Sequence, residues 1–149
     1  MQETGEMEVA KLLKGRDPAD IIRCDVDTKV RDVVALLAGK RIGAVPVMER
    51  GNVAGIFSER DVLYRLADEG ALCLDRKVGE VMTSPPITVE PSTDTDEAMA
   101  LMTRRRIRHL PVCDKGEMCG FVSIGDLVKS RMDAIEAEAQ NLRTYIQTA

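Results

Sequence analysis

The stretch RIGAVPVMERGNVAGIFSERD (residues 41–61) recurs 65 positions later as RIRHLPVCDKGEMCGFVSIGD (residues 106–126). Extended on both sides, the two copies cover residues 22–65 and 87–130 without a gap, and 12 of the 44 aligned pairs are identical. A unit this short buries too little apolar surface to be stable alone, so we expect the copies to pack on each other about a pseudo-two-fold axis. Such packing creates two related clefts, and small molecules usually bind in concave sites at internal interfaces.

The composition narrows the classes of function. The 149-residue chain is 44% hydrophobic and 31% charged, which is ordinary for one soluble domain. No apolar run approaches the roughly 20 residues that span a bilayer, and the acidic residues 1–6 do not resemble a secretory signal, so we expect a cytoplasmic protein with no membrane partner. The net charge of −4 argues against binding to nucleic acid.

Each copy is predicted to fold as strand, helix, strand, strand, helix. In the first copy, apolar residues at helical spacing predict a helix over 30–37, and short apolar runs predict strands over 44–48 and 53–57 that are joined by a turn at Gly51. The last strand of each copy leads into a helix. We expect the first repeat, with a short N-terminal helix, to cover residues 7–70, the second repeat to cover 71–131, and a helical extension to cover 132–149.

The C-terminal region carries an apolar seam at heptad-type spacing. Its members follow one another at intervals of 4, 3, 4, 3 and 4 positions: Val128, Met132, Ile135, Ala139, Leu142 and Ile146. The seam either packs on its own domain or contacts the helix of a second subunit. Fewer than three full heptads bind weakly alone, so in a homodimer the faces of the repeats would contribute as well.

A Ser-x-x-Asp motif opens the last helix of each copy, as Ser58 with Asp61 and as Ser123 with Asp126. One interpretation is a capping box, which satisfies backbone donors at a helix start without any ligand. The other is a ligand site, in which free N–H groups bind a phosphate and the carboxylate accepts hydrogen bonds from ribose hydroxyls.

Basic residues near these motifs differ between the copies. Arg60 lies in the first helical turn, where a bound anion would offset the unfavourable dipole, while its equivalent is Gly125. Arg108 and His109 precede the strand of the second copy, where the first copy has Gly43 and Ala44. The small pair leaves room for a flat ring and the basic pair suits a phosphate, so the two clefts are not expected to be identical.

We expect no catalytic activity, because none of the common nucleotide-binding, hydrolase or metalloprotease motifs occurs and one histidine cannot build a metal site with these cysteines. The four cysteines lack zinc-type spacing and are interpreted as small reduced apolar residues. Cys113 and Cys119 flank a predicted turn, so a redox-sensitive disulfide between them stays an alternative.

The ordered motifs resemble the cystathionine-β-synthase-type (CBS) domain, present as a tandem pair called a Bateman module. The matching segments are RIGAVPV (41–47) with GIFSERD (55–61), and RIRHLPV (106–112) with GFVSIGD (120–126). The linker VGEVMTSPPITVEPSTDTDEAM (78–99) is also similar to the segment between repeats of that family. The resemblance implies a mixed α/β (α+β) fold of two β-α-β-β-α repeats, here followed by a long C-terminal helix.

The resemblance also implies adenosine-containing regulatory ligands, namely AMP, ADP, ATP, NAD or S-adenosylmethionine, and pairing into a disk-shaped homodimer. By position, Asp61 and Asp126 would hold ribose hydroxyls. The residues that would hold phosphate are Ser58, Arg60, Arg108, His109 and Ser123. The residues that would contact adenine or shape the clefts are Ile22, Arg23, Cys24, Gly43, Ala44, Val45, Pro46, Ile87, Thr88, Val89, Leu110, Pro111 and Gly125.

The sequence therefore predicts a regulatory module that senses an adenine nucleotide and signals to a separate protein. The alternatives are an enzyme that turns over a nucleotide, a dimeric scaffold whose clefts stay empty, and a protein that responds to thiol oxidation.

Overall fold

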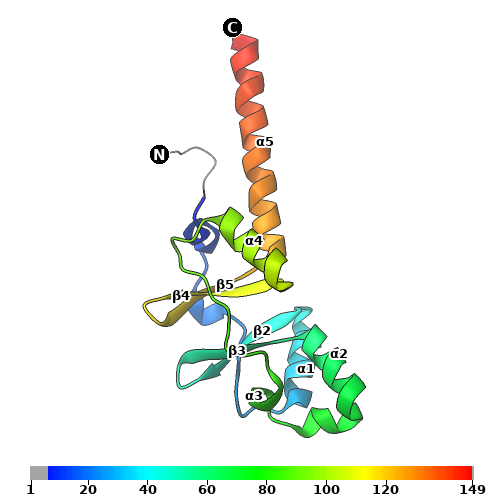
Figure 1. The fold of residues 1–149 in the computed structure, drawn as a ribbon. Helices are drawn as coiled ribbons and strands as arrows, with labels where there is room; N and C mark the ends of the chain where they lie inside the picture. The colour runs from blue at the N-terminus through cyan, green and yellow to red at the C-terminus, as the bar shows by residue number, and fades with distance from the viewer. Residues whose placement is uncertain (1–6, 149) are drawn as a thin grey trace.

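The computed structural model describes residues 7–148 and contains two stacked repeats with one long projecting helix (Figure 1). The first repeat consists of β1 (Cys24–Asp25), α1 (Val30–Lys40), β2 (Ala44–Glu49), β3 (Asn52–Ser58) and α2 (Glu59–Glu69). The second consists of α4 (Thr95–Arg105), β4 (His109–Asp114), β5 (Glu117–Ser123) and α5 (Ile124–Thr148). Shorter helices precede and join them: η1 (Val9–Leu13), η2 (Pro18–Asp20), η3 (Gly70–Asp75) and α3 (Val78–Val81). The predicted α+β fold of two repeats is confirmed.

The two sheets share one register. In the first, β2 lies between a parallel β1 and an antiparallel β3, and Cys24 is paired with Val47. In the second, β4 and β5 are antiparallel. The first strand predicted for the second copy is reduced to one parallel bridge between Val89 and Val112, which are the equivalents of Cys24 and Val47.

Each repeat buries its own hydrophobic core, and each core is completed by the segment that precedes the other repeat. Val9 of η1 is fully buried with the core of the second repeat, and its amide donates to the carbonyl of Thr93 at 2.8 Å. Val78 and Val81 of α3 are buried in the core of the first repeat. Because η1 and α3 are exchanged in this way, the chain must cross between the repeats twice.

Glycines at equivalent positions of the two repeats allow the close approach of Met82 and Thr83 on one side and of Leu13 on the other. A Cβ atom on Gly55 would lie 2.6 Å from both the Met82 sulfur and the Thr83 carbonyl oxygen. A Cβ atom on Gly120 would lie 2.5 Å from Leu13. Gly55 is therefore required by the close approach of the Thr83 backbone, whereas Gly120 leaves room for the Leu13 side chain.

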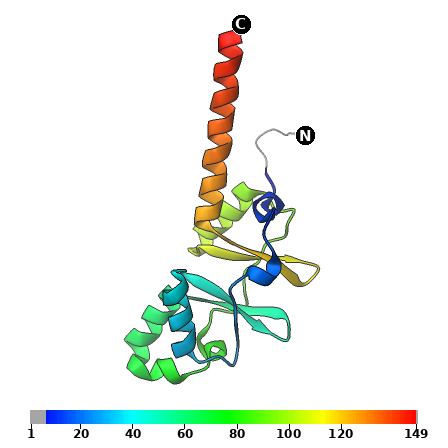
Figure 2. The ribbon, with the colours of Figure 1, turned by 180° about the vertical axis from the view of Figure 1, so that it is seen from behind.

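The first crossing is a segment that we call the strap, residues 14–23. It leaves η1 on the second repeat and runs back to the first repeat (Figure 2). Gly15 adopts a φ of +79°, and the Asp17 carboxylate accepts from the amide of Ala19 at 2.9 Å. The Arg23 guanidinium donates to the carbonyls of Ile21, at 3.1 Å, and of Pro18. These contacts fix the path of the strap.

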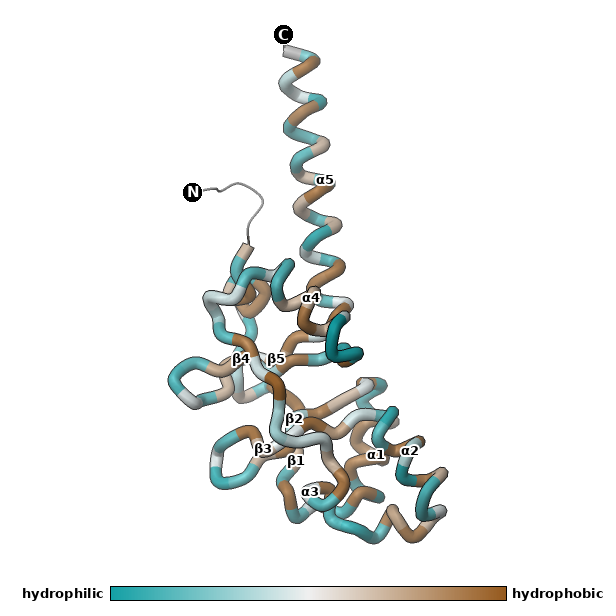
Figure 3. The backbone as a smooth tube through the Cα atoms, in the orientation of Figure 1, coloured by the Kyte–Doolittle hydropathy of each residue, from teal (hydrophilic) through white to brown (hydrophobic). Residues whose placement is uncertain are grey.

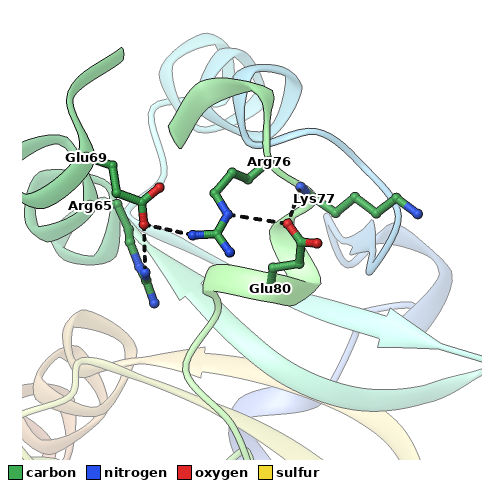
Figure 4. A network of polar contacts seen from close by, with 5 residues as sticks. All are labelled: Arg65, Glu69, Arg76, Lys77 and Glu80. Carbon is green, nitrogen blue, oxygen red and sulfur yellow. Dashed lines mark hydrogen bonds and ion pairs between the residues drawn. The ribbon is translucent and has the colours of Figure 1, made fainter. Parts of the chain in front are cut away.

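A polar network around Glu69 joins α2 to α3 before the second crossing begins (Figure 4). The carboxylate of Glu69 accepts from Arg65 at 2.9 Å and from Arg76 at 2.8 Å. Arg76 also contacts Glu80 of α3 at 3.4 Å. These groups are partly exposed, so each pair contributes modestly, but together they hold the end of α2 against the start of α3.

Helix α5 begins in the second repeat and extends well beyond it (Figure 1). The large apolar side chains of its seam are exposed, so the seam does not pack on its own domain. Of the helices formed by residues 7–148, none is long and apolar enough to cross a membrane.

Candidate functional site

A cleft of about 630 Å³ lies between the repeats on the side of the strap. The strap forms one wall, and the end of α1 with the start of β2 (residues 41–44) forms another. The second repeat contributes β5, His109 and the first turn of α5. The cleft therefore joins three parts of the chain that are distant in sequence.

Asp126 brings a half-buried carboxylate to this cleft, where Asp17 and Asp20 of the strap also lie. One carboxylate oxygen accepts from the amide of Ser123 at 2.9 Å, and the other lies 3.2 Å from the Arg16 guanidinium of the strap. Burial alone would raise the pKa of Asp126, but the hydrogen bonds from Ser123 and the charge of Arg16 outweigh it, so the pKa lies below its usual value. Asp126 is consequently an anion at neutral pH, and Arg16 is its counter-ion.

His109 and Phe121 form an aromatic pair on the same side. Their ring centroids are 5.6 Å apart and the rings are inclined by 15°. Burial lowers the pKa of His109, and Arg108 lowers it further, against the opposing effects of Asp126 and Glu59. The imidazole is therefore mostly neutral near pH 7, where it offers a hydrogen bond rather than a positive charge for phosphate.

The equivalent carboxylate, Asp61, accepts hydrogen bonds from its own repeat and from the segment that follows α3. One oxygen accepts from the Ser58 amide at 2.9 Å and from its hydroxyl at 3.0 Å, while the other accepts from the Thr83 hydroxyl at 3.0 Å. Arg60 reaches across to the second repeat and donates to the carbonyl of Arg106 at 3.1 Å. Asp61 and Arg60 do not line the 630 Å³ cleft.

Both helix starts are already capped, which supports the capping interpretation of Ser-x-x-Asp. Ser58 and Asp61 make a complete capping box. The amides of Glu59 and Ile124 donate to the carbonyls of Gly43 and Arg108, at 3.0 and 2.8 Å. Fewer free N–H groups therefore remain at the two helix starts for an anion than the sequence suggests.

The predicted site residues fall into separate groups. Those that line the cleft are Ile22, Gly43, Ala44, His109, Ser123 and Asp126. Three belong to the hydrophobic cores rather than the cleft: Val45, Val89 and Leu110. Pro46 and Pro111 are buried, and Ile87 packs against the second core. The exposed residues are Arg23, Arg60, Thr88, Arg108 and Gly125. Arg23 braces the strap. Cys24 contacts the Pro46 carbonyl at 4.0 Å, and burial, together with Asp25, raises its thiol pKa to about 11.

Sequence reasoning missed the strap and the charges that it carries. The cleft residues not predicted include Arg16, Asp17, Asp20, Ile21, Arg41 and Phe121. Residues 14–21 of the strap precede the repeated region, so the duplication gives no signal for them. The one available signal is the turn-forming run Gly15-Arg16-Asp17-Pro18, which indicates an ordered turn but not its location.

The cysteines are free thiols throughout residues 7–148. The register places Met118 opposite Cys113, with Cys119 beside a bulge, so Cys113 and Cys119 are not directly opposed as the predicted turn implied.

Over residues 7–148, no group of three or more His, Cys, Asp or Glu side chains is arranged to hold a metal ion.

Comparison with known proteins gives the family. The sequence model described as the CBS domain matches residues 18–68 and 78–133. The chain belongs to the CBS-domain family. It is 40% identical over 129 residues to the mitochondrial CBS domain-containing protein CBSX3 of Arabidopsis thaliana, covering 83% of this chain and 63% of that protein.

Two solved structures place the fold among CBS-domain pairs. A CBS-domain-containing protein from Agrobacterium tumefaciens is 36% identical, with a TM-score of 0.78 over 84% of this chain and 99% of that chain. CBSX2 in complex with AMP is 26% identical, with a TM-score of 0.72 over 85% of this chain and 96% of that chain.

Proposed function

We propose that this CBS-domain pair is a regulatory module that binds an adenosine-containing ligand in the Asp126 cleft and signals to a separate protein. The observation that carries the proposal is the cleft itself, about 630 Å³ between the repeats with an ionised carboxylate in its lining. This volume lies in the range of about 300–1,000 Å³ that small-molecule sites occupy. The AMP complex of the related CBSX2 supports the choice of ligand class.

The lining offers a partner for each part of such a ligand. The Asp126 carboxylate can accept hydrogen bonds from both hydroxyls of a ribose. Ile21, Ile22 and Ala44 provide apolar surface for adenine, and Arg16 and Arg41 provide guanidinium groups for phosphate. Neutral His109 adds a hydrogen-bonding group beside the base or the sugar.

Arg16 connects ligand binding to a change in the chain. It contacts Asp126 at 3.2 Å, so a ribose that binds Asp126 competes with it and a phosphate offers it a new partner. The strap that carries Arg16 links the two cores through η1 and β1. A ligand that favours one strap position shifts the equilibrium by its differential affinity, typically about 1–3 kcal/mol.

Calorimetric titration of AMP into the native chain, Asp126→Asn and Asp61→Asn tests this assignment. Asparagine keeps an oxygen for the helix cap and removes the charge, so the two variants are matched. We expect Asp126→Asn to weaken AMP binding at least about tenfold, which corresponds to about 1.4 kcal/mol, and Asp61→Asn to leave it nearly unchanged.

Equal loss in both variants would move the site away from the Asp126 cleft. No binding of AMP, ADP, ATP, NAD or S-adenosylmethionine to the native chain would favour the scaffold alternative. The same samples, incubated with ATP and analysed for products, test the prediction that the chain is not an enzyme.

The homodimer is part of the same proposal. Leu63 and Tyr64 on α2 are each 65% exposed, and Val128, the equivalent of Leu63 on α5, is 46% exposed. Large apolar side chains at equivalent helix positions of both repeats suit the face of a second copy. The cytoplasmic location stays a prediction from the sequence.

A further inference from the structure

The seam of α5 faces away from the rest of the chain. Its large members are between 46% and 64% exposed: Val128, Met132, Ile135, Leu142 and Ile146. The domain contacts come from the opposite side of the helix, where Leu127 is fully buried and Ser130 contacts the Met7 sulfur at 2.9 Å. Apolar residues accordingly recur along the projecting part of α5 (Figure 3).

We infer that this seam pairs with the seam of a second copy as a parallel, in-register two-helix coiled coil. Spacing assigns the two core positions of the heptad. Position a holds Met132, Ala139 and Ile146, and position d holds Val128, Ile135 and Leu142. The flanking position e then holds Lys129, Glu136 and Arg143, and position g holds Arg131, Glu138 and Tyr145.

The flanking charges choose the orientation. In a parallel pair, position g of one helix faces position e of the next heptad on the other helix. Arg131 then faces Glu136 of the second copy, and Glu138 faces Arg143 of the second copy. Two-fold symmetry repeats both contacts, so all four contacts between charged g and e residues are attractive.

An antiparallel pair with full overlap has the opposite result. It sets position e against e and position g against g. Glu136 then meets Glu136 of the second copy, Glu138 meets Glu138, and Lys129 meets Arg143. Like charges in contact are destabilising, so the sequence of α5 disfavours this arrangement.

Contacts within the chain leave these charges available. Lys129 contacts Asp133 at 3.0 Å, one turn along the same helix, and takes no part in the contacts of the parallel pair. Arg131 contacts Asp96 at 3.6 Å, but the two side chains are 51% and 57% exposed, so this contact is weak. A parallel pair places both second repeats at the same end of the coil, which fixes the orientation that the homodimer proposal leaves open.

Cysteine crosslinking in the full chain tests the orientation. Ile146→Cys places a thiol at position a near the C-terminal end, where two parallel helices bring the thiols together. In an antiparallel pair each thiol lies near residue 128 of the other copy, about 27 Å from its counterpart at 1.5 Å per residue. Ala137→Cys, at the outer position f, is the control for random collisions, and the native chain is the control for its own cysteines.

We expect mild oxidation to give a covalent dimer with Ile146→Cys at least about tenfold faster than with Ala137→Cys, because the parallel pair holds the thiols in contact. Equal rates would overturn the parallel coiled coil, whether the seam is then empty, antiparallel or covered by a different protein.

A charge exchange tests the pairing itself. One variant carries Glu136→Arg with Glu138→Arg, and the other carries Arg131→Glu with Arg143→Glu. Each meets only like charges in its own dimer, whereas a mixture restores every attractive pair. Native mass spectrometry is expected to show heterodimers above the statistical fraction, and a statistical mixture would overturn the proposed charge pairs. AMP titration of the same variants is expected to match the native chain, so a failure here is distinct from a failure of the ligand site.

Discussion

The sides of the molecule that contain Asp61 and Asp126 derive from one duplicated unit but differ in what holds the carboxylate. Asp61 accepts from Ser58, three residues before it, and from Thr83, 22 residues after it. Asp126 accepts from Ser123 and from Arg16, which lies 110 residues away on the strap. The first arrangement stays within residues 58–83, whereas the second joins the second repeat to the strap.

A single position widens this difference. Arg60 spans the gap between the repeats and donates to the Arg106 carbonyl, whereas its equivalent, Gly125, has no side chain to reach Arg41. The duplicated backbone thus supplies two similar frameworks that differ in the side chains placed between the repeats.

The largest expected effect comes from copying the first repeat into the second. Gly125→Arg adds a side chain that can donate to the Arg41 carbonyl and cross the open cleft. The nearest atom to a Cβ at this position is the Ser123 hydroxyl oxygen at 3.5 Å, an ordinary contact, so the fold accepts the change. We expect AMP affinity to fall at least about tenfold, or about 1.4 kcal/mol, in a calorimetric titration.

Gly125→Ala is the control and is expected to bind AMP like the native chain. Tighter binding by Gly125→Arg would mean that the new guanidinium recognises phosphate, and it would contradict the view that an arginine here closes the cleft.

An intermediate effect is expected from Arg16→Ala, which removes the counter-ion of Asp126. If Arg16 exchanges Asp126 for phosphate, AMP binding weakens while uncharged adenosine binds as well or better. We expect the ratio of AMP affinity to adenosine affinity to fall about three- to tenfold. This is a small effect for the loss of a charge-assisted hydrogen bond, because Arg16 is 48% exposed and water screens its charge.

Arg31→Ala, which removes an exposed ion pair with Asp75 outside the cleft, is the matched control for Arg16→Ala. A parallel loss of AMP and adenosine binding in Arg16→Ala would show that Arg16 only maintains the strap.

The smallest expected effect is the pH dependence that His109 contributes. Its pKa in the folded chain is below 6.5, so on acidification the unfolded chain takes up this proton first. The free energy of unfolding therefore falls as pH drops through 6.5 toward the folded pKa. Urea unfolding at about pH 7.5 and about pH 5.5 is expected to show a larger loss for the native chain than for His109→Gln. Identical losses would place the histidine in a more exposed setting than the cleft.

Duplication made the fold predictable, since the order of strands and helices follows from one pattern used twice. The same pattern located Ser123, Asp126 and Gly43 near the cleft. The pattern did not locate Arg16, because Arg16 precedes the duplicated residues. It placed Val45 and Leu110 in the clefts because the sequence of a short buried strand does not show which of its faces meets the cleft. The exchange of η1 and α3 also left no local trace, since contact between distant segments is not encoded in either alone.

That exchange has a mechanical consequence. With Val9 lodged in one hydrophobic interior and Val78 in the other, neither half retains all its buried residues when the chain is cut between them. We therefore expect the two repeats to unfold as one cooperative unit, and a displacement of the strap to act on both hydrophobic cores.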